Sequence, residues 1–312
     1  MPRCSLQCPD GRKGDSNETS VKTYFPPRKY PPTMTNLSYF DRKRQLVSVF
    51  NDTLQRIGSS QELQAAVSQS IASQQYIGDA DKIDLPAPSY TEKARVVVSR
   101  LRSFEAAARY PGQKVTVLNF ASSTSPGGGV ENGASAQEEC LCRVSTLYPC
   151  LKAQAAWEKF YGPHRAAPNP LHNDDIIYTQ DVVVLKDDDY NVLSSPFHVD
   201  VITCAAPNLR DIPSNRYNRN DGEVHIGSEK LLELHLKRAR KILSVAAANG
   251  AEVLILGAFG CGAFRNDPTV VAAAYQQALP QFLNHFKTIE FAVYCSPRDQ
   301  RNYDAFTKIR NV

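Results

Sequence analysis

Residues 117–144 read VLNFASSTSPGGGVENGASAQEECLCRV and contain an apolar run, a glycine-rich loop and an amphipathic segment in that order. The apolar run starts near residue 114 and ends at Phe120, and its β-branched character is typical of a buried strand. Beyond the loop, apolar residues recur at three- and four-residue steps, at Leu141, Val144, Tyr148 and Leu151. This spacing predicts a helix. The stretch is therefore a strand, a loop and a helix, which is the repeating unit of an α/β sheet.

The rest of the C-terminal part repeats this alternation. Further short β-branched runs occupy residues 181–186, 198–204, 252–259 and 289–295, and we expect each to be a strand. A helical period covers residues 228–249 and stops at Gly250, and Asn266-Asp267-Pro268 supplies the cap and first-turn proline of another helix. Strands that alternate with helices predict a three-layer α/β/α domain.

The N-terminal part has a different texture. Residues 38–75 predict two helices interrupted at Gly58, Ser59 and Ser60, and residues 91–109 predict a third. We therefore expect residues 35–110 to form a helical extension and residues 111–312 to form the core of one folded domain, 35–312. Residues 1–34 are rich in Pro, Lys, Arg, Ser and Thr without a sustained apolar period, so we expect a disordered basic tail.

Charge and composition exclude several kinds of protein. The formal net charge of the 312 residues is +4, but residues 1–45 hold nine basic and four acidic residues, which leaves 27 basic against 28 acidic in the remainder. Direct nucleic-acid binding by the folded part is therefore not expected, and the basic clusters PPRKYPP and DRKRQ favour a solvated tail over a nucleic-acid site. No apolar run is long enough to span a membrane. Eight cysteines without a secretory segment indicate reduced thiols in an intracellular protein, nuclear or cytoplasmic, and their spacing predicts no metal site.

Two glycine-rich loops each follow a predicted strand. The first holds Gly127, Gly128 and Gly129, and the second, in VLILGAFGCGAFRNDP, holds Gly257, Gly260 and Gly262. Such loops let backbone N–H groups approach an anion closely, at the edge of the sheet where α/β proteins bind ligands. The second loop has Ala263 and Phe264 where a Walker A motif needs Lys and Ser or Thr, and Asn132 stands where a dinucleotide fingerprint needs glycine. Neither common nucleotide motif fits.

Carboxylates follow the first loop at the predicted start of the helix. Ser135 and Glu138 have the spacing of a capping box, which explains Glu138 without a catalytic role. Glu139 could complement the helix dipole. Beside an anion-binding loop it could instead be protonated near neutral pH and act as a general acid. The residues alone leave both readings of Glu139 open.

The pattern GGG, seven intervening residues and QEE, at residues 127–139, resembles the signature of poly(ADP-ribose) glycohydrolases, a family of macrodomain-fold enzymes. The wider segments LNFASSTSPGGG and GAFGCGAFRNDP resemble the microbial type found in bacteria and filamentous fungi. The resemblance covers about residues 38–312. It implies a macrodomain core with a mixed central sheet and a helical extension before it, and no cofactor or metal.

The resemblance also implies roles for particular residues. Glu139 would be the catalytic residue, and Glu138, also assigned to the catalytic pair, would position the scissile ribose together with Gln137. Asn119 is a weaker candidate for a ribose contact. The remaining substrate-binding residues belong to the two loops: Gly127, Gly128 and Gly129 would close over ADP-ribose, the backbone of Gly260, Cys261, Gly262 and Ala263 would hold its diphosphate, and Phe264 would pack on the distal ribose.

The implied activity is hydrolysis of the ribose–ribose O-glycosidic bonds of poly(ADP-ribose), with release of ADP-ribose. Glu139 would protonate the departing oxygen as general acid and then serve as base, while the diphosphate stabilises the oxocarbenium-like sugar. Expected partners are poly(ADP-ribose), ADP-ribose and ADP-ribosylated proteins, and we expect a monomer. Two alternatives stay open: a non-hydrolytic ADP-ribose-binding module of the same fold, and a cysteine hydrolase using Cys140 or Cys261.

Overall fold

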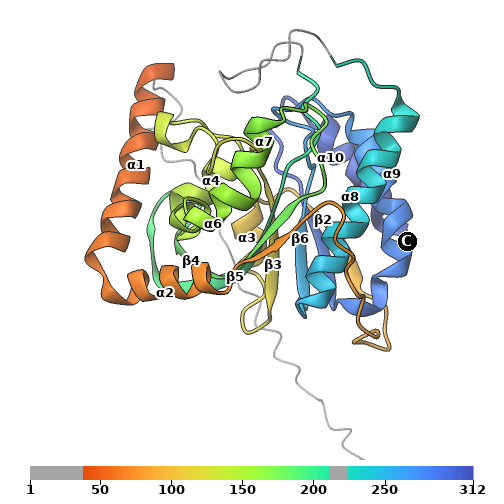
Figure 1. The fold of residues 1–312 in the computed structure, drawn as a ribbon, viewed down its shortest axis with the longest axis horizontal. Helices are drawn as coiled ribbons and strands as arrows, with labels where there is room; N and C mark the ends of the chain where they lie inside the picture. Colours follow the sequence, from red (N-terminus) through yellow and green to blue (C-terminus); the bar gives the residue numbers. More distant parts are fainter. Residues whose placement is uncertain (1–37, 211–223, 312) are drawn as a thin grey trace, which may run out of the picture.

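The computed structural model describes residues 38–210 and 224–311, and its centre is a mixed seven-stranded sheet with helices on both faces (Figure 1). The strand order is β1-β4-β5-β3-β6-β7-β2. The strands are β1 (Gln75–Ile77), β2 (Arg95–Ser99), β3 (Val115–Phe120), β4 (Ile176–Lys186), β5 (Val192–Cys204), β6 (Val253–Leu256) and β7 (Thr288–Ala292). The five strands from β5 to β2 are parallel, whereas β4 is antiparallel to both of its neighbours. The predicted tail, with Cys4 and Cys8, lies outside the described residues.

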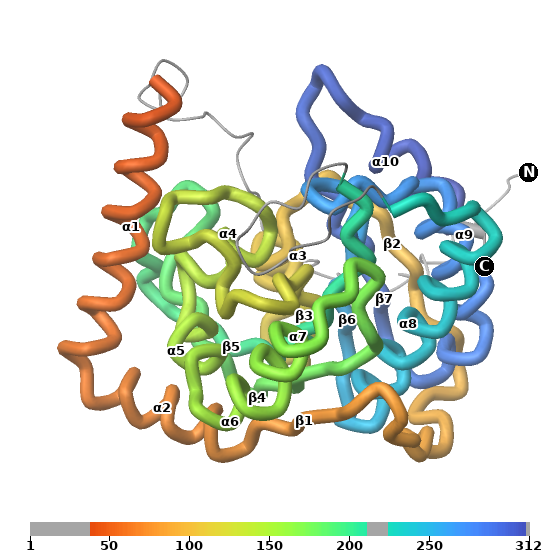
Figure 2. Tube along the Cα trace, turned by 45° about the horizontal axis from the view of Figure 1, so that its top comes forward, coloured from red at the N-terminus to blue at the C-terminus, as the bar shows by residue number. Residues whose placement is uncertain are grey.

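The helices form the two outer layers. They are α1 (Tyr39–Ser59), α2 (Gln61–Ala72), α3 (Ser103–Ala107), α4 (Gln137–Val144), α5 (Leu147–Leu151), α6 (Gln154–Ala156), α7 (Gly162–Ala166), α8 (Ser228–Ala248), α9 (Pro268–Ala278) and α10 (Arg301–Phe306). In the tube view, α1, α2 and α4 to α6 lie on one side of the sheet and α8 and α9 on the other (Figure 2). The predicted three-layer α/β/α architecture is confirmed.

The side-chain alternation of the strands builds one hydrophobic core on each face. In β3, Leu118 packs in the cluster that contains α8 and α9, whereas the neighbouring Val117 packs in the cluster that contains α4 and α5. β5 and β6 repeat this alternation. Both faces of these strands are covered, which explains why their sequences are continuously apolar instead of alternating with polar residues.

The five predicted strands are present, with different bounds. The antiparallel pair is longer than expected, since β4 begins at Ile176 and β5 at Val192 and the two form an extended ladder with irregular register. β6 is shorter, because the chain leaves the sheet after Leu256 to form the second glycine loop. The local apolar runs therefore predict where these strands lie, but pairing with the neighbouring strands determines where each strand begins and ends.

The helix predicted for residues 91–109 is wrong. Residues Arg95–Ser99 form the edge strand β2, parallel to β7, and only Ser103–Ala107 become helical. The β-branched Val96, Val97 and Val98 suit a strand, and Val98 is buried in the core. β1 pairs with β4, so the segment expected as a helical extension also supplies both edge strands of the sheet.

The helix predicted to continue to residue 151 is also interrupted. α4 ends at Val144 and α5 begins at Leu147, because the chain between them pairs with β4. Ser145 forms a β-bridge with Val184, and the Thr146 N–H donates to the carbonyl oxygen of Val183 at 3.0 Å. The backbone groups that would continue the helix are used by the sheet instead.

The predicted helix ends are confirmed where capping chemistry is local. The Ser38 hydroxyl oxygen accepts from the Asp41 N–H at the start of α1, and Ser60 does the same for Leu63 at the start of α2. Asp267 caps α9 by accepting from Thr269, with proline in the first turn. These ends depend on residues adjacent in the chain, which is why the sequence locates them.

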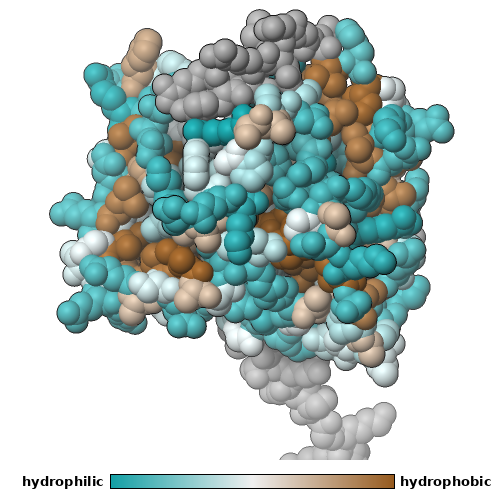
Figure 3. All heavy atoms as spheres, viewed as in Figure 1, coloured by the Kyte–Doolittle hydropathy of each residue, from teal (hydrophilic) through white to brown (hydrophobic). Residues whose placement is uncertain are grey.

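The surface is mixed in character. On the face drawn in Figure 3, hydrophilic residues lie between several separate hydrophobic patches. The most exposed large hydrophobic residues in the described part of the chain are Tyr39, Phe40 and Val192. Within residues 38–210 and 224–311, no helix has both the length and the apolar character needed to cross a bilayer.

One buried ion pair connects α8 to the loops near the site. The Arg238 Nε donates to Asp174 at 2.6 Å and Nη1 donates to the Ala205 carbonyl at 2.9 Å. We predict that Arg238→Met lowers the free energy of unfolding by roughly 3 kcal/mol, because Asp174 keeps only its contact with Lys237. Urea unfolding measures the change. The matched variant Lys230→Met, in an exposed pair, should cost less than about 1 kcal/mol, and equal losses would contradict the prediction.

Candidate active site

The two glycine loops and the acidic start of α4 meet in one cleft. The cleft has a volume of about 1170 Å³ and lies at the carboxyl ends of the central parallel strands. Of the residues predicted for a site, the structure brings together Gly128, Gly129, Gln137, Glu138, Glu139, Gly260, Gly262, Ala263 and Phe264 along its lining. Gly127, Asn119 and Cys261 are not among the residues that line the cleft. The predicted convergence of two distant loops is therefore observed.

The first loop wraps closely around the carboxylate of Glu139. Gly128 has a φ of 59°, and a Cβ built on it would lie 2.5 Å from Oε1 of Glu139. The next backbone N–H, that of Gly129, donates to the same oxygen at 2.9 Å. Glycine is needed here because the chain must adopt a left-handed conformation and leave room for the acid.

Glu139 is held by one oxygen only. Its side chain lines the cleft and is 8% exposed. While Oε1 accepts from Gly129, the buried Oε2 has no hydrogen-bond partner within the described part of the chain. A buried polar atom without a partner is costly, so such an atom at the wall of a cleft suits contact with a ligand. Glu139 therefore has one oxygen fixed by the protein and one without a partner among the described residues.

Glu138 does not form the predicted capping box. The N-cap residue of α4 is Ala136, without a side-chain cap, and the Glu138 carboxylate instead accepts from the Ser122 N–H at 2.8 Å and the Asn119 Nδ2 at 3.4 Å. Burial raises the pKa of Glu138 well above its usual range, and the charge of neighbouring Glu139 raises it further. The capping interpretation is wrong because the side chain points toward β3 and away from its own backbone.

Gln137 fastens the start of α4 to the end of β3. Its Oε1 accepts from the Phe120 N–H at 2.8 Å, while Nε2 donates to the Leu118 carbonyl at 2.8 Å and to the Ser103 hydroxyl at 3.0 Å. Both ends of the amide are thus engaged within the protein. This arrangement fixes the first turn of α4, and with it the two acids that follow, relative to the sheet.

α1 closes the cleft on the side of the first loop. Tyr39, Arg42 and Lys43 line the cleft from its first turns. Further along, the Thr53 hydroxyl donates to the Arg143 carbonyl at 2.6 Å, and the Arg143 Nε donates to the Leu46 carbonyl at 3.3 Å. These buried contacts join α1 to α4, so the N-terminal helix is part of the site's wall.

The second loop is fastened by a side chain that the sequence analysis missed. Gly260, with a φ of 77°, approaches Ala206 so closely that a Cβ would lie 2.6 Å from that of Ala206. The buried Asn266 holds this turn, since its Nδ2 donates to the Pro207 carbonyl at 2.6 Å and to the Gly260 carbonyl at 3.1 Å. The local sequence predicts for Asn266 only a place before a helix, because its partners are distant in the chain.

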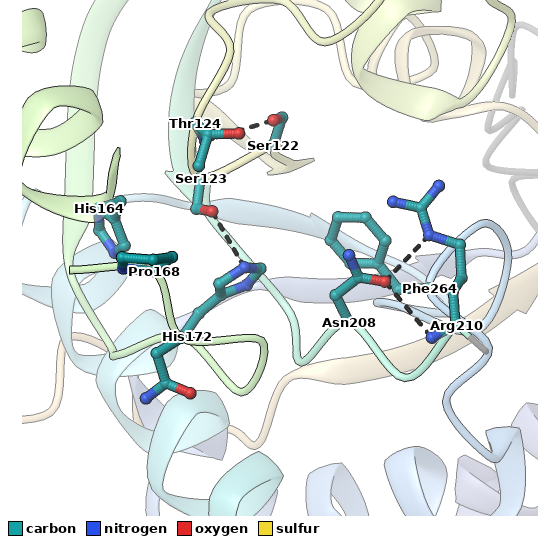
Figure 4. A pocket seen from close by; sticks show the side chains of 10 residues that line it. Ser122, Ser123, Thr124, His164, Pro168, His172, Asn208, Arg210 and Phe264 are labelled. Atoms are coloured by element: carbon teal, nitrogen blue, oxygen red, sulfur yellow. Dashed lines mark hydrogen bonds between the residues drawn. The ribbon is translucent and has the colours of Figure 1, made fainter. Parts of the chain in front are cut away.

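A small cavity of about 30 Å³ adjoins the cleft (Figure 4). In its wall, the Ser123 hydroxyl and His172 Nε2 are 3.0 Å apart, and His172 Nδ1 lies 2.8 Å from the Ala206 carbonyl. Burial lowers the pKa of His172 to about 3, so the ring is neutral. A neutral ring that donates from Nδ1 to the carbonyl accepts at Nε2 from Ser123. His172 therefore orients the turn that also carries the Ser122 N–H to Glu138.

The cysteine alternative gains no support. Burial raises the pKa of both the Cys140 and the Cys261 thiols, which disfavours the nucleophilic thiolate. Cys140 Sγ contacts the Ser135 carbonyl, and Cys261 Sγ contacts the Phe259 carbonyl. Across residues 38–210 and 224–311, no three His, Cys, Asp or Glu side chains are grouped as a metal ion would require.

Comparisons with known proteins give the family of this chain. Residues 45–187 match the family described as microbial-type PARG, catalytic domain. The chain is 30% identical to the structure of poly(ADP-ribose) glycohydrolase from Thermomonospora curvata, with a TM-score of 0.74, over 85% of this chain and 99% of that one. It is 29% identical to the enzyme from Deinococcus radiodurans in complex with ADP-ribose, with a TM-score of 0.63, over 78% of this chain and 96% of that one. No match was found among curated proteins.

The raised pKa of Glu138 predicts a pH-dependent stability. A carboxyl group whose pKa rises on folding binds its proton more tightly in the folded state, so the free energy of unfolding falls as pH rises above the ordinary value of 4.5. We predict that Glu138→Gln, which cannot ionise, is more stable than the wild type near neutral pH by about 1 kcal/mol or more. The advantage should vanish toward pH ~4.

Urea unfolding at the two pH values measures this difference. Glu62→Gln, at an exposed position of α2, serves as the control and should show no pH-dependent gain. An advantage of Glu138→Gln that is equal at both pH values would show that the ionisation of Glu138 is not its cause.

Proposed function

Since the chain belongs to the microbial-type poly(ADP-ribose) glycohydrolase family, we propose that it hydrolyses the ribose–ribose O-glycosidic bonds of poly(ADP-ribose) and releases ADP-ribose. The observation that carries this proposal is Glu139. One of its oxygens is fixed by the Gly129 N–H, and the other lies buried and without a described partner at the wall of the cleft. This arrangement suits a general acid that must reach one particular bond.

The two loops supply a binding surface for the substrate. In our proposal the first loop, residues 127–129, covers the ADP-ribose, and the backbone of residues 260–263 holds its diphosphate. Phe264 lines the cleft beside the second loop and packs on the distal ribose. Backbone N–H groups bind phosphate oxygens but carry no formal charge. A folded domain with a formal net charge near zero can therefore bind a polyanionic substrate.

The proposed chemistry is a protonation followed by addition of water. Protonated Glu139 donates its proton to the oxygen that leaves the ribose C1 atom, the C–O bond breaks, and the sugar acquires oxocarbenium character. The substrate's diphosphate stabilises this cation. The ionised Glu139 then accepts a proton from the water that adds at C1, which restores the acid. Both proton transfers use one carboxyl group of this chain.

Glu138 and Asn119 position the reacting groups. The raised pKa of Glu138 favours the neutral form of this carboxyl, which limits the negative charge beside Glu139 and the diphosphate. The buried Oδ1 of Asn119 has no hydrogen-bond partner in the described residues, while its Nδ2 donates to Glu138 and to the Thr203 hydroxyl. We propose that the pair orients the scissile ribose together with Gln137.

The proposed partners are poly(ADP-ribose), ADP-ribose and the ADP-ribosylated proteins that carry the polymer. A monomer suffices for the activity, because both loops, the acidic turn and the α1 wall come from a single chain.

We predict that Glu139→Gln lowers kcat for release of ADP-ribose from polymer by about 10²- to 10⁴-fold, because the amide cannot deliver a proton. ADP-ribose affinity should remain, since the side chain keeps its shape. Chromatography of the released ADP-ribose measures the rate, and titration calorimetry measures the binding. The exposed Glu62→Gln variant should match the wild type in both. A wild-type protein that binds ADP-ribose without releasing it from polymer would instead be a binding module.

A further inference from the structure

The charges around the cleft are unbalanced at the second loop. A bound diphosphate brings negative charge into the cleft, and burial of that charge is costly unless a cation compensates. Among the described residues, four basic side chains line the cleft, namely Arg42, Lys43, Arg102 and Arg210. The first two belong to α1, on the side of the first loop. Position and existing partners decide which of the four can reach a diphosphate held by residues 260–263.

Arg102 already has a compensating partner. Its Nε lies 4.0 Å from the carboxylate of Asp188, and its guanidinium stacks 4.3 Å from the ring centre of Tyr294. Arg210 differs in both position and partner. It follows β5 in the chain, directly beside the second loop, because the Leu209 N–H donates to the Phe264 carbonyl at 2.9 Å.

The guanidinium of Arg210 is held in place by neutral groups. Its Nε donates to Oδ1 of Asn208 at 3.0 Å, and its central carbon lies 5.3 Å from the centre of the Phe264 ring. Figure 4 shows the three side chains side by side, with the guanidinium extending beyond the ring. Arg210 lines both the cleft and the small cavity. Its position is thus fixed before any ligand binds.

No carboxylate in the described residues forms an ion pair with Arg210. Burial and the positive charge of neighbouring Arg265 both lower the pKa of its guanidinium. Within the described part of the chain, the hydrogen-bond partner of this half-buried guanidinium is an amide oxygen, so its positive charge is not compensated there. An anion entering the cleft would relieve this arrangement, whereas a neutral ligand would not.

We propose that Arg210 is the counter-ion of the substrate's diphosphate and completes the anion site formed by the backbone of residues 260–263. This inference rests on the proposed function and adds to it a charged, specificity-determining residue. The planar guanidinium can donate two parallel hydrogen bonds to phosphate oxygens. Arg210 also stacks on Phe264, the ring that in our proposal contacts the distal ribose. The two stacked side chains would therefore position both the diphosphate and the distal ribose.

The test compares two substitutions at this position. Arg210→Met retains the apolar stem against Phe264 and removes the charge, and we predict that it raises the Kd for ADP-ribose by roughly 10- to 100-fold. Arg210→Lys retains the charge without the planar fork and should lie between Met and the wild type. The loss should shrink as salt is added. Because the diphosphate is bound in both ground and transition states, KM should rise while kcat changes little.

Calorimetry with ADP-ribose at low and high salt, and polymer hydrolysis rates, give these values. Arg100→Met is the matched control, since Arg100 stacks on Tyr303 outside the cleft and should leave the Kd unchanged. The inference is overturned if Arg210→Met binds ADP-ribose as tightly as the wild type, or weakens it equally at all salt concentrations. Failure of the proposed function looks different, because the wild type itself would release no ADP-ribose.

Discussion

The pairing of β3 with β5 on one side and β6 on the other is the constraint on which the rest of the site depends. Because these strands are parallel, their carboxyl ends lie at the same edge, and the loops that follow them must meet there. The amide of Gln137 then ties the first turn of α4 to the last residues of β3. Two loops more than a hundred residues apart in the chain thus form one cleft, with the acids fixed at its wall.

Electrostatic interactions make the two neighbouring carboxyl groups of this cleft differ. Two adjacent carboxyl groups near a polyanion cannot both be ionised without a large cost, and burial of Glu138 favours its neutral form. Glu139 differs only in its contacts, with one oxygen held by a backbone N–H and the other without a described partner. In our proposal, the same chemical group therefore serves as a support at one position and as an acid at the next.

Local sequence signals predicted those elements whose determinants are local. The strand ending at Phe120, the helix start near residue 38 and the proline-initiated α9 follow from adjacent residues, and each is found. The errors share a cause. Residues 95–99 form the edge strand β2 because they pair with the parallel strand β7. The helix stops before Ser145 because Ser145 forms an antiparallel bridge with Val184. Tertiary pairing competes with helix propensity, and the sequence does not show which strand will be the neighbour.

The sequence by itself determined which chemical groups are available. Glycines 127–129 allow the backbone conformations that the loop needs, and the QEE triplet places two acids next to each other in the chain. Only the tertiary structure decided how they are used. It turned Glu138 toward Asn119 and the Ser122 N–H instead of its own helix cap, and it set Arg210 on Phe264 beside the second loop. The physical reason is that burial, hydrogen-bond partners and uncompensated charge depend on groups brought from distant parts of the chain, and these assign different roles to identical side chains.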